Sequence, residues 1–305
     1  MKCGSAMMRI LGIVGVQICI CVPIIVFQFC KGKEFFSKEY WGYALRIGIP
    51  IVPHYLSGII LNQGDRIMID KMVGKTEVAL YGLAYSIGML VQLFISGMNS
   101  ALTPWMYSKI KKGDIRSMRK VLQLLSVVVV GIAVALMLIS PELVLIFGSP
   151  KYREAVYVIP PVAASVFFIF IYNILSMPQF YYEKTQFLMA ASMAAAGANV
   201  VLNFIFIRLF GYIAAGYTTL ACYMLYSVGH YIVSKRILVN EGIQENLMSP
   251  GFLVACSAFL IGASIICNLI FPYRILRYAI LLASAGLVFW KKELLLKTMA
   301  DIRKK

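Results

Sequence analysis

The chain has few charged residues, and acidic ones are especially scarce. Only 14% of its 305 residues are charged, whereas soluble domains average about 25%. Thirteen acidic residues stand against 29 Lys and Arg, and 61% of the chain is hydrophobic. So few charges cannot cover the surface of a water-soluble globule of this size. The composition therefore excludes a soluble enzyme, a disordered chain and a nucleic-acid-binding protein, and we expect no nucleic-acid partner.

Histidine is nearly absent, and cysteine shows no functional spacing. His54 and His230 are the only histidines, which excludes His-rich metal sites and zinc-protease helices. The seven cysteines lie in or beside apolar runs, without the spacing of a metal site or a disulfide framework. The glycine–lysine pairs also lack the upstream glycine of a phosphate-binding loop. We therefore expect no metal, no cofactor and no ATP.

Long apolar runs dominate what remains. Nine segments reach at least the length that favours a membrane span over a buried helix. They are Ile10–Phe29, Trp41–Asn62, Val78–Leu102, Val121–Phe147, Ala155–Met177, Phe187–Phe210, Tyr212–Val233, Phe252–Phe271 and Tyr273–Trp290. The sequence predicts an all-α, polytopic membrane bundle of about nine transmembrane helices joined by short loops.

The distribution of Lys and Arg predicts the orientation. They are more numerous on the side that holds Lys109–Lys120 and the tail after Trp290, and the richer side is expected to be cytoplasmic. Gln63–Glu77 and Gly148–Glu154 are then exterior, and the C-terminus is cytoplasmic. An odd number of spans leaves the N-terminus outside although it is basic. We expect from this conflict that an odd number of spans once preceded Met1.

Polar and small side chains recur at helical spacing in several segments. In the third segment they are Tyr81, Tyr85, Gly88, Gln92, Ser96, Asn99 and Thr103. Asn173, Asn199 and Tyr223 belong to comparable stripes in the fifth, sixth and seventh segments. Such stripes line a hydrated cavity or let helices pack closely. Gln92 and Asn99 favour a cavity, because amides near mid-membrane are costly without partners.

The second segment carries ionisable residues and two prolines. Pro50 and Pro53 are expected to kink the helix. Arg46, His54 and Asp65 are functional candidates because ionisable groups in the bilayer are costly. Each also has a structural interpretation. Arg46 could extend to the cytoplasmic surface, His54 could be bonded into packing, and Asp65 could form an interfacial pair with the arginine that follows it.

A family pattern lies in two runs, RIGIPIVPHYLSGIILNQGDRIMIDKMVGKTEVALYGLAYSIG and then NSALTPWMYSKIKKGD. It has G-x-P in a span, D-R at its outer end, then G-x-x-x-V-A-x-Y-G and N-x-A-x-x-P-W. GSPKYREAVYVIPP and FGYIAAGYTTL fit the same pattern further on. In order and spacing these motifs resemble the polysaccharide flippases of the multidrug/oligosaccharidyl-lipid/polysaccharide exporter superfamily.

The resemblance implies a transporter of the cytoplasmic membrane that flips polyprenyl-diphosphate-linked oligosaccharide or polysaccharide repeat units by alternating access. It implies two six-helix lobes around a central cavity. Residues 1–40 would be the last helix of the first lobe and a connector, 41–234 the second lobe, and 235–305 two appended helices with a basic tail. Five helices would be missing. Its partners would be the lipid-linked glycan, membrane lipids and either a first lobe supplied in trans or a second copy.

Residue roles follow from the resemblance and from the substrate's chemistry. Arg46 would attract the diphosphate, and the side chains facing the sugar would be those of Gln92, Asn99, Asn173, Asn199 and Tyr223. His54 and Asp65 would be the candidates for ion coupling, with His54 also in the substrate-binding set. The cavity needs no covalent chemistry, so we expect a transporter and not an enzyme.

Three other functions fit less well. A multidrug or cation antiporter of the same superfamily would need acidic residues inside the spans, yet these contain essentially none apart from Glu142 beside Pro141. An integral-membrane glycan polymerase or glycosyltransferase would need a sizeable exterior loop, and the longest one predicted is Gln63–Glu77. The third alternative is an inactive remnant of a broken reading frame.

Overall fold

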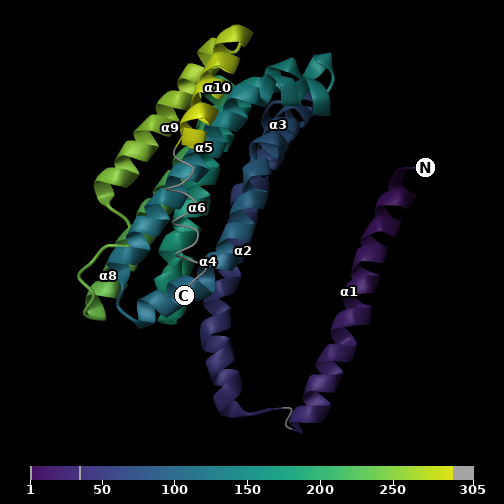
Figure 1. Ribbon diagram of the computed structural model, residues 1–305. Coiled ribbons are helices and arrows are strands. Elements are labelled where there is room, and N and C mark those ends of the chain that lie inside the picture. Colours follow the sequence, from purple (N-terminus) through teal and green to yellow (C-terminus); the bar gives the residue numbers. More distant parts are fainter. Residues whose placement is uncertain (1, 34–35, 291–305) are drawn as a thin grey trace. The chain divides into compact units, whose positions relative to one another are not determined.

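The computed structural model describes residues 2–33 and 36–290 (Figure 1). The predicted cytoplasmic tail, residues 291–305, lies outside the described residues. The chain divides into two units, Met1–Ile49 and Pro50–Lys305. The predicted boundaries at residues 40 and 234 stay predictions.

Every secondary-structure element of the described residues is a helix, and none is a strand, which confirms the all-α fold. The elements are α1 (Lys2–Gly32), α2 (Lys38–Met72), α3 (Lys75–Gly88), α4 (Leu90–Lys111), α5 (Ile115–Phe147), the 3₁₀ helix η1 (Pro150–Val158), α6 (Ile159–Tyr181), α7 (Thr185–Phe210), α8 (Ile213–Asn240), α9 (Pro250–Ile270) and α10 (Arg274–Trp290).

Seven helical stretches are long and apolar enough to cross a membrane among the residues searched. They contain α1, α2, α3 with α4, α5, η1 with α6, α7 and α9. The other two predicted spans form helices that do not meet this standard. Helix α10 has only 17 residues, and α8 carries many polar side chains on its buried face. The chain is a multi-pass membrane protein.

Unit 1 contains α1 and the start of α2. The apolar side chains of α1 from Ile10 to Phe29 are exposed within the chain. Lipid is the environment in which such a surface is stable. Helix α2 continues from unit 1 into unit 2 at Pro50, and Pro53 follows one turn later. Neither proline can donate a backbone hydrogen bond, so the helix is weakened where the two units meet in the sequence.

Helix α6 forms the centre of unit 2 and packs against α3, α4, α5, α8 and α9 (Figure 1). Its first turn contains Pro160 and Pro161. Proline suits a helix start because it lacks the backbone N–H, which would have no partner inside the helix at these positions. The expected single helix from residue 155 therefore begins as the separate 3₁₀ helix η1. The neighbours approach α6 through glycine: a Cβ on Gly88 would lie 2.6 Å from Val162 Cγ1.

The predicted third span is two helices and not one. Helix α3 ends at Gly88 and α4 begins at Leu90, with Met89 between them. The amide of Met89 donates to Tyr85 O, and its carbonyl accepts from Gln92 N. The polar residues expected to form one stripe are thus divided between two helices.

Helix α5 begins at a well-defined cap. The carboxylate of Asp114 accepts hydrogen bonds from Lys109 Nζ at 2.6 Å and from Ser117 Oγ at 2.8 Å, and it also accepts from the Ser117 amide at 3.3 Å. The bond from Lys109 is the main reason that the pKa of Asp114 is lowered to about 2. The turn between α4 and α5 is therefore fixed by charge as well as by capping.

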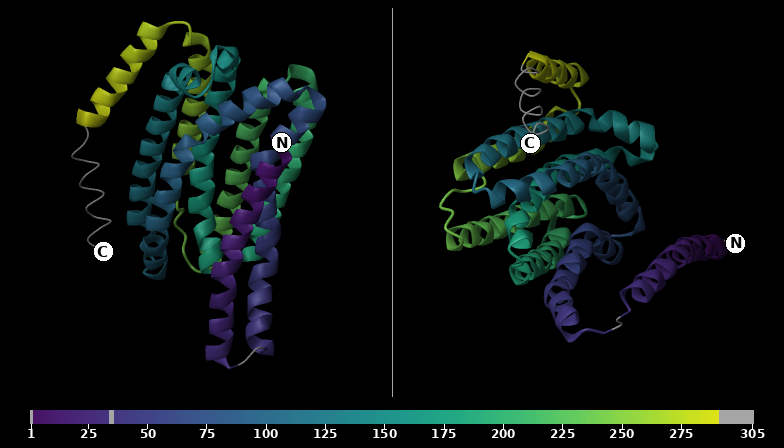
Figure 2. Two further views of the ribbon diagram at one scale, coloured as in Figure 1. Left: turned by 90° about the vertical axis from the view of Figure 1, so that its right-hand side faces the viewer. Right: turned by 60° about the horizontal axis from the view of Figure 1, so that its bottom comes forward.

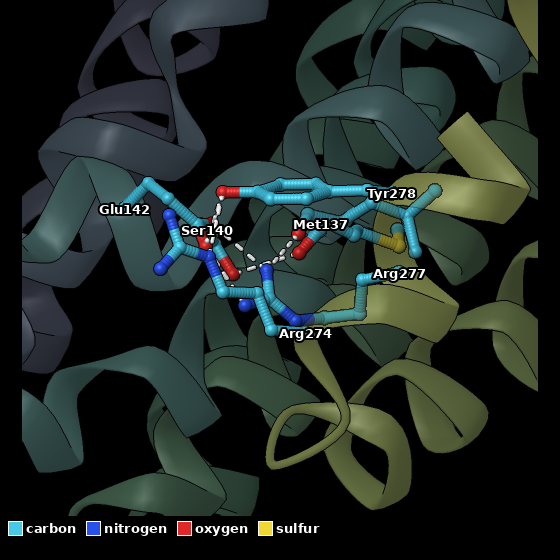
Figure 3. A network of polar contacts seen from close by, with 7 residues as sticks. Met137, Ser140, Glu142, Arg274, Arg277 and Tyr278 are labelled. Atoms are coloured by element: carbon cyan, nitrogen blue, oxygen red, sulfur yellow. Dashed lines mark hydrogen bonds and ion pairs between the residues drawn. The ribbon is translucent and has the colours of Figure 1, made fainter. Parts of the chain in front are cut away.

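Helices α9 and α10 pack on the α5 side of unit 2 (Figure 2). Arg277 of α10 forms a two-pronged ion pair with Glu142 of α5, with both N–O distances 2.8 Å (Figure 3). Arg277 also donates to the carbonyl of Leu138 at 2.6 Å, and the hydroxyl of Tyr278 donates to Glu142 at 2.9 Å. Glu142, the acidic residue noted inside a predicted span, is thus part of a link between helices.

Candidate functional site

A cavity of about 760 Å³ lies within unit 2. Its wall is formed by one face of α2 together with residues of α3, α6, α8 and Met89. The lining residues are His54, Tyr55, Gly58, Ile59, Leu61, Asn62, Gln63, Arg66, Tyr85, Ser86, Met89, Tyr172, Asn173, Ser176, Phe180, Tyr223 and Tyr226. His54 and Arg66 are twelve positions apart, or about 18 Å at helical rise, so the cavity follows α2 for roughly that length.

The His54 end of the cavity is aromatic. The ring nitrogen Nδ1 of His54 is 3.1 Å from the hydroxyl of Tyr226. Tyr172 packs against Tyr226 with ring centroids 4.4 Å apart and lies nearly parallel to Tyr223 at 6.3 Å. Behind them, His230 accepts a hydrogen bond from the Gln179 amide at 2.8 Å. This end of the wall is a cluster of packed rings, in which His54 and Tyr226 are joined by a hydrogen bond.

Asn62 fixes the middle of the wall. Its side-chain oxygen accepts hydrogen bonds from Tyr85 at 2.7 Å and from Tyr223 at 3.3 Å, and its amide nitrogen donates to the carbonyl of Gly58. One amide thereby connects α2 to α3 and α8. Asn173 and Ser176 add a further amide and hydroxyl from α6.

Asp65 lies behind this wall, fully buried. Its carboxylate accepts hydrogen bonds from Tyr81, from Asn203 at 2.5 Å and from Thr219 at 2.6 Å. Asn199 in turn accepts from Asn203 at 3.2 Å. Helices α2, α3, α7 and α8 meet at this carboxylate, and all the groups that bind it are neutral.

The next residue, Arg66, faces the cavity. Its guanidinium carbon is 5.2 Å from the centre of the Tyr85 ring, and Nη1 donates to Gln63 Oε1 at 3.3 Å. Among the described residues Arg66 forms no ion pair with a carboxylate. The interfacial pair considered for Asp65 and Arg66 is therefore not formed, because the helix directs the two side chains to different neighbours.

The cavity brings together three of the expected site residues, His54, Asn173 and Tyr223. Asn199 is buried beside Asp65 instead. Two others, Gln92 and Asn99, do not line this cavity. Arg46 is exposed and belongs to unit 1, and Gln92 and Asn99 are half-buried on α4. Whether any of the seven contacts a substrate stays a prediction.

Sequence reasoning missed four residues of the wall: Asn62, Arg66, Tyr85 and Tyr172. One signal was available, because Asn62 and Arg66 continue the row of every fourth residue that starts at His54. The two tyrosines lie on polar stripes at helical spacing, yet a stripe alone does not select them. Their place in the wall depends on which helices pack against α2.

Part of the chain matches a known protein family. A model described as "Polysaccharide biosynthesis protein" matches residues 5–111, which run from α1 to the end of α4. Over these residues the chain is similar to the polysaccharide biosynthesis proteins. This confirms the resemblance expected from the sequence at the level of that family.

Two proteins of Haemophilus influenzae are similar to this chain. One is named "Lsg locus putative protein 1" and is 28% identical over 172 residues, which are 53% of this chain and 41% of that protein. The other is named "Uncharacterized membrane protein" and is 29% identical over 167 residues, or 51% and 40%. The matched region thus spans about two fifths of each relative. No solved structure matches the chain.

Proposed function

We propose that this protein is a membrane transporter that moves the sugar part of a polyprenyl-diphosphate-linked saccharide across the cytoplasmic membrane. The observation that carries the proposal is the cavity along α2, whose lining includes amides, hydroxyls and tyrosines within a membrane bundle. The match to polysaccharide biosynthesis proteins supports a sugar as the cargo.

The chemistry of the wall suits a saccharide. Asn62, Asn173 and Ser176 offer groups that exchange hydrogen bonds with sugar hydroxyls, and the rings of Tyr172 and Phe180 offer apolar faces for the carbon skeleton. The polyprenyl tail stays in lipid throughout, because it gains nothing from entering a polar cavity. Only the head group needs the cavity, and the protein needs no covalent step.

Two prolines at the start of the unit 2 part of α2 support alternating access. Pro50 and Pro53 interrupt its hydrogen bonds just before His54, the first residue of the cavity wall. Bending at such a site lets one end of the wall open while the other is closed. His54 at the wall and Asp65 behind it are the candidates for coupling this motion to an ion gradient.

A cation or drug antiporter is the weaker alternative. Such a transporter binds its cargo through acidic side chains in the cavity. None of the described lining residues is Asp or Glu, and the nearest carboxylate in sequence, Asp65, is saturated by hydrogen bonds. The lining favours neutral or anionic cargo.

The test is a reconstitution with polyprenyl-diphosphate-linked N-acetylglucosamine in the inner leaflet of vesicles. An impermeant glycosyltransferase added outside modifies each sugar that reaches the outer leaflet. We expect modification above that of protein-free vesicles, with and without proton and sodium gradients as separate arms. Equal modification in vesicles with and without protein, in every arm, would refute the proposal.

A matched pair of glycine substitutions links the activity to the cavity. Gly58 and Gly97 are both helical, and a Cβ at either one would meet no atom within 4 Å. Only Gly58 lines the cavity. We expect Gly58→Phe to fill the cavity and abolish transfer, while Gly97→Phe leaves it near the wild-type rate. Equal rates in the two variants would show that the sugar takes another route.

A further inference from the structure

We infer that Arg66 is an anion-binding residue of the cavity, and that it binds the oxyanion of the transported glycolipid, either a phosphate of the linker or a carboxylate of an acidic sugar. The inference rests on the proposed function and assigns to Arg66 the role that sequence reasoning gave to Arg46. Of the described lining residues, Arg66 alone carries a fixed charge.

The guanidinium is held in place before any ligand arrives. It stands over the ring of Tyr85, and the hydroxyl of that ring is fixed by Asn62. Gln63 accepts one of its N–H groups. These two contacts favour one position of the guanidinium, which lowers the entropy cost of binding a ligand.

The positive charge has no acidic partner. Within the described part of the chain, the ion pairs are Lys109–Asp114 and Arg277–Glu142, and Arg66 takes part in neither. The carboxylate of the adjacent Asp65 accepts hydrogen bonds from three neutral donors and forms no ion pair with Arg66. Nε of Arg66 is buried and finds no partner among the described residues. A half-buried guanidinium with a free N–H favours an anion, since an unpaired buried donor is unfavourable.

The neighbouring groups narrow the class of ligand. A guanidinium binds phosphate and carboxylate through paired N–H groups, better than an ammonium does. Asn62 and Ser86 lie in the same wall and can bond to hydroxyls. An oxyanion attached to a polyhydroxylated ring matches this set, and both a glycosyl diphosphate and an acidic sugar have that form.

The experiment measures binding to the full chain in nanodiscs with two pairs of probes. Geranylgeranyl diphosphate and geranylgeraniol differ by the diphosphate, and octyl glucuronide and octyl glucoside differ by a carboxylate. We expect wild type to bind at least one anionic probe about tenfold more tightly than its neutral partner, as one charged hydrogen-bond pair would give. The anionic probe that is preferred identifies the source of the oxyanion.

Arg66→Gln should remove this preference, and Arg66→Lys should weaken it about threefold because the paired donor is lost. The Lys variant decides the matter if the Gln variant does not fold. The matched control is Arg208→Gln. Arg208 is exposed, stands 3.8 Å over the ring of Phe204 and does not line the cavity, so its removal should leave the preference unchanged.

The outcomes separate this inference from the proposed function. An unchanged preference in both Arg66 variants, or a wild type that does not distinguish the probes, would overturn the anion site, while sugar transfer in vesicles could still be positive. Anion binding that depends on Arg66 in a protein that transfers no sugar would support the site and refute the transporter.

Discussion

In the ion pair between α5 and α10, the two partners differ in burial, so removing one should cost more stability than removing the other. The side chain of Arg277 is 4% exposed and that of Glu142 is 26% exposed (Figure 3). Removing the carboxylate with Glu142→Leu would leave a buried guanidinium whose remaining bond is to the carbonyl of Leu138. Removing the guanidinium with Arg277→Met would leave a carboxylate that keeps the hydroxyl of Tyr278 and some water.

The two single changes should therefore differ in cost. Stranding one partner of a buried ion pair costs about 3–5 kcal/mol, and we expect Glu142→Leu to fall near the lower end of that range. Arg277→Met should cost about 1–2 kcal/mol, because the exposed part of Glu142 is solvated and screened. The double variant should be more stable than Glu142→Leu alone, since it buries no unpaired charge.

Unfolding in mixed micelles with increasing SDS, followed by circular dichroism, measures these free energies. Arg116→Met is the control, because Arg116 is exposed on α5 and forms no ion pair with a described carboxylate. It should change stability by about 0.5 kcal/mol or less. The reasoning fails if Arg277→Met is the costlier single change, or if the two changes are additive within about 0.5 kcal/mol.

Three further predictions concern packing, pH and orientation. Gly88→Ala should cost about 1–3 kcal/mol in the same unfolding assay because its Cβ would meet α6, and Gly82→Ala, where a Cβ has open space, should not destabilise. Asp114→Ala should cost about 1 kcal/mol as a lost cap. Since its lysine hydrogen bond lowers the pKa of Asp114 to about 2, the difference from wild type should be full above the ordinary carboxyl pKa and vanish as the pH falls toward 2. A single cysteine in place of Lys112, in a cysteine-free chain, should resist an impermeant thiol reagent in intact cells, and labelling from outside would contradict a cytoplasmic loop.

Much of the fold was predictable because helix length and apolar composition are properties of one segment at a time. The runs at Ile10–Phe29 and Val121–Phe147 each form a helix without reference to any neighbour. The break at Met89 and the 3₁₀ start before Ile159 were not predicted. The break at Met89 follows the close approach of Gly88 to α6, and η1 packs against α3, α5 and α8. Periodicity within a segment carries no information about such neighbours.

The site was predictable only in part, for a related reason. His54, Asn173 and Tyr223, three of the residues chosen from the sequence, line one cavity, and their contact with a substrate stays a prediction. Gln92 and Asn99 lie at helical spacing on α4, yet they do not line the cavity. A stripe identifies the polar face of a helix, whereas the order of helices around the cavity decides which faces are opposed.

The packing order of the helices also gives the adjacent residues Asp65 and Arg66 different neighbours. Adjacent residues on a helix point about 100° apart, so each meets a different environment. The carboxylate is bonded by Tyr81, Asn203 and Thr219 and holds four helices together. Those donors are neutral. Among the described residues, neither Asp65 nor Arg66 forms an ion pair. A pair that the sequence presents as self-neutralising therefore supplies a buried carboxyl group behind the wall and a guanidinium charge on it. That separation provides both a candidate for ion coupling and a candidate for anion binding within one turn of α2.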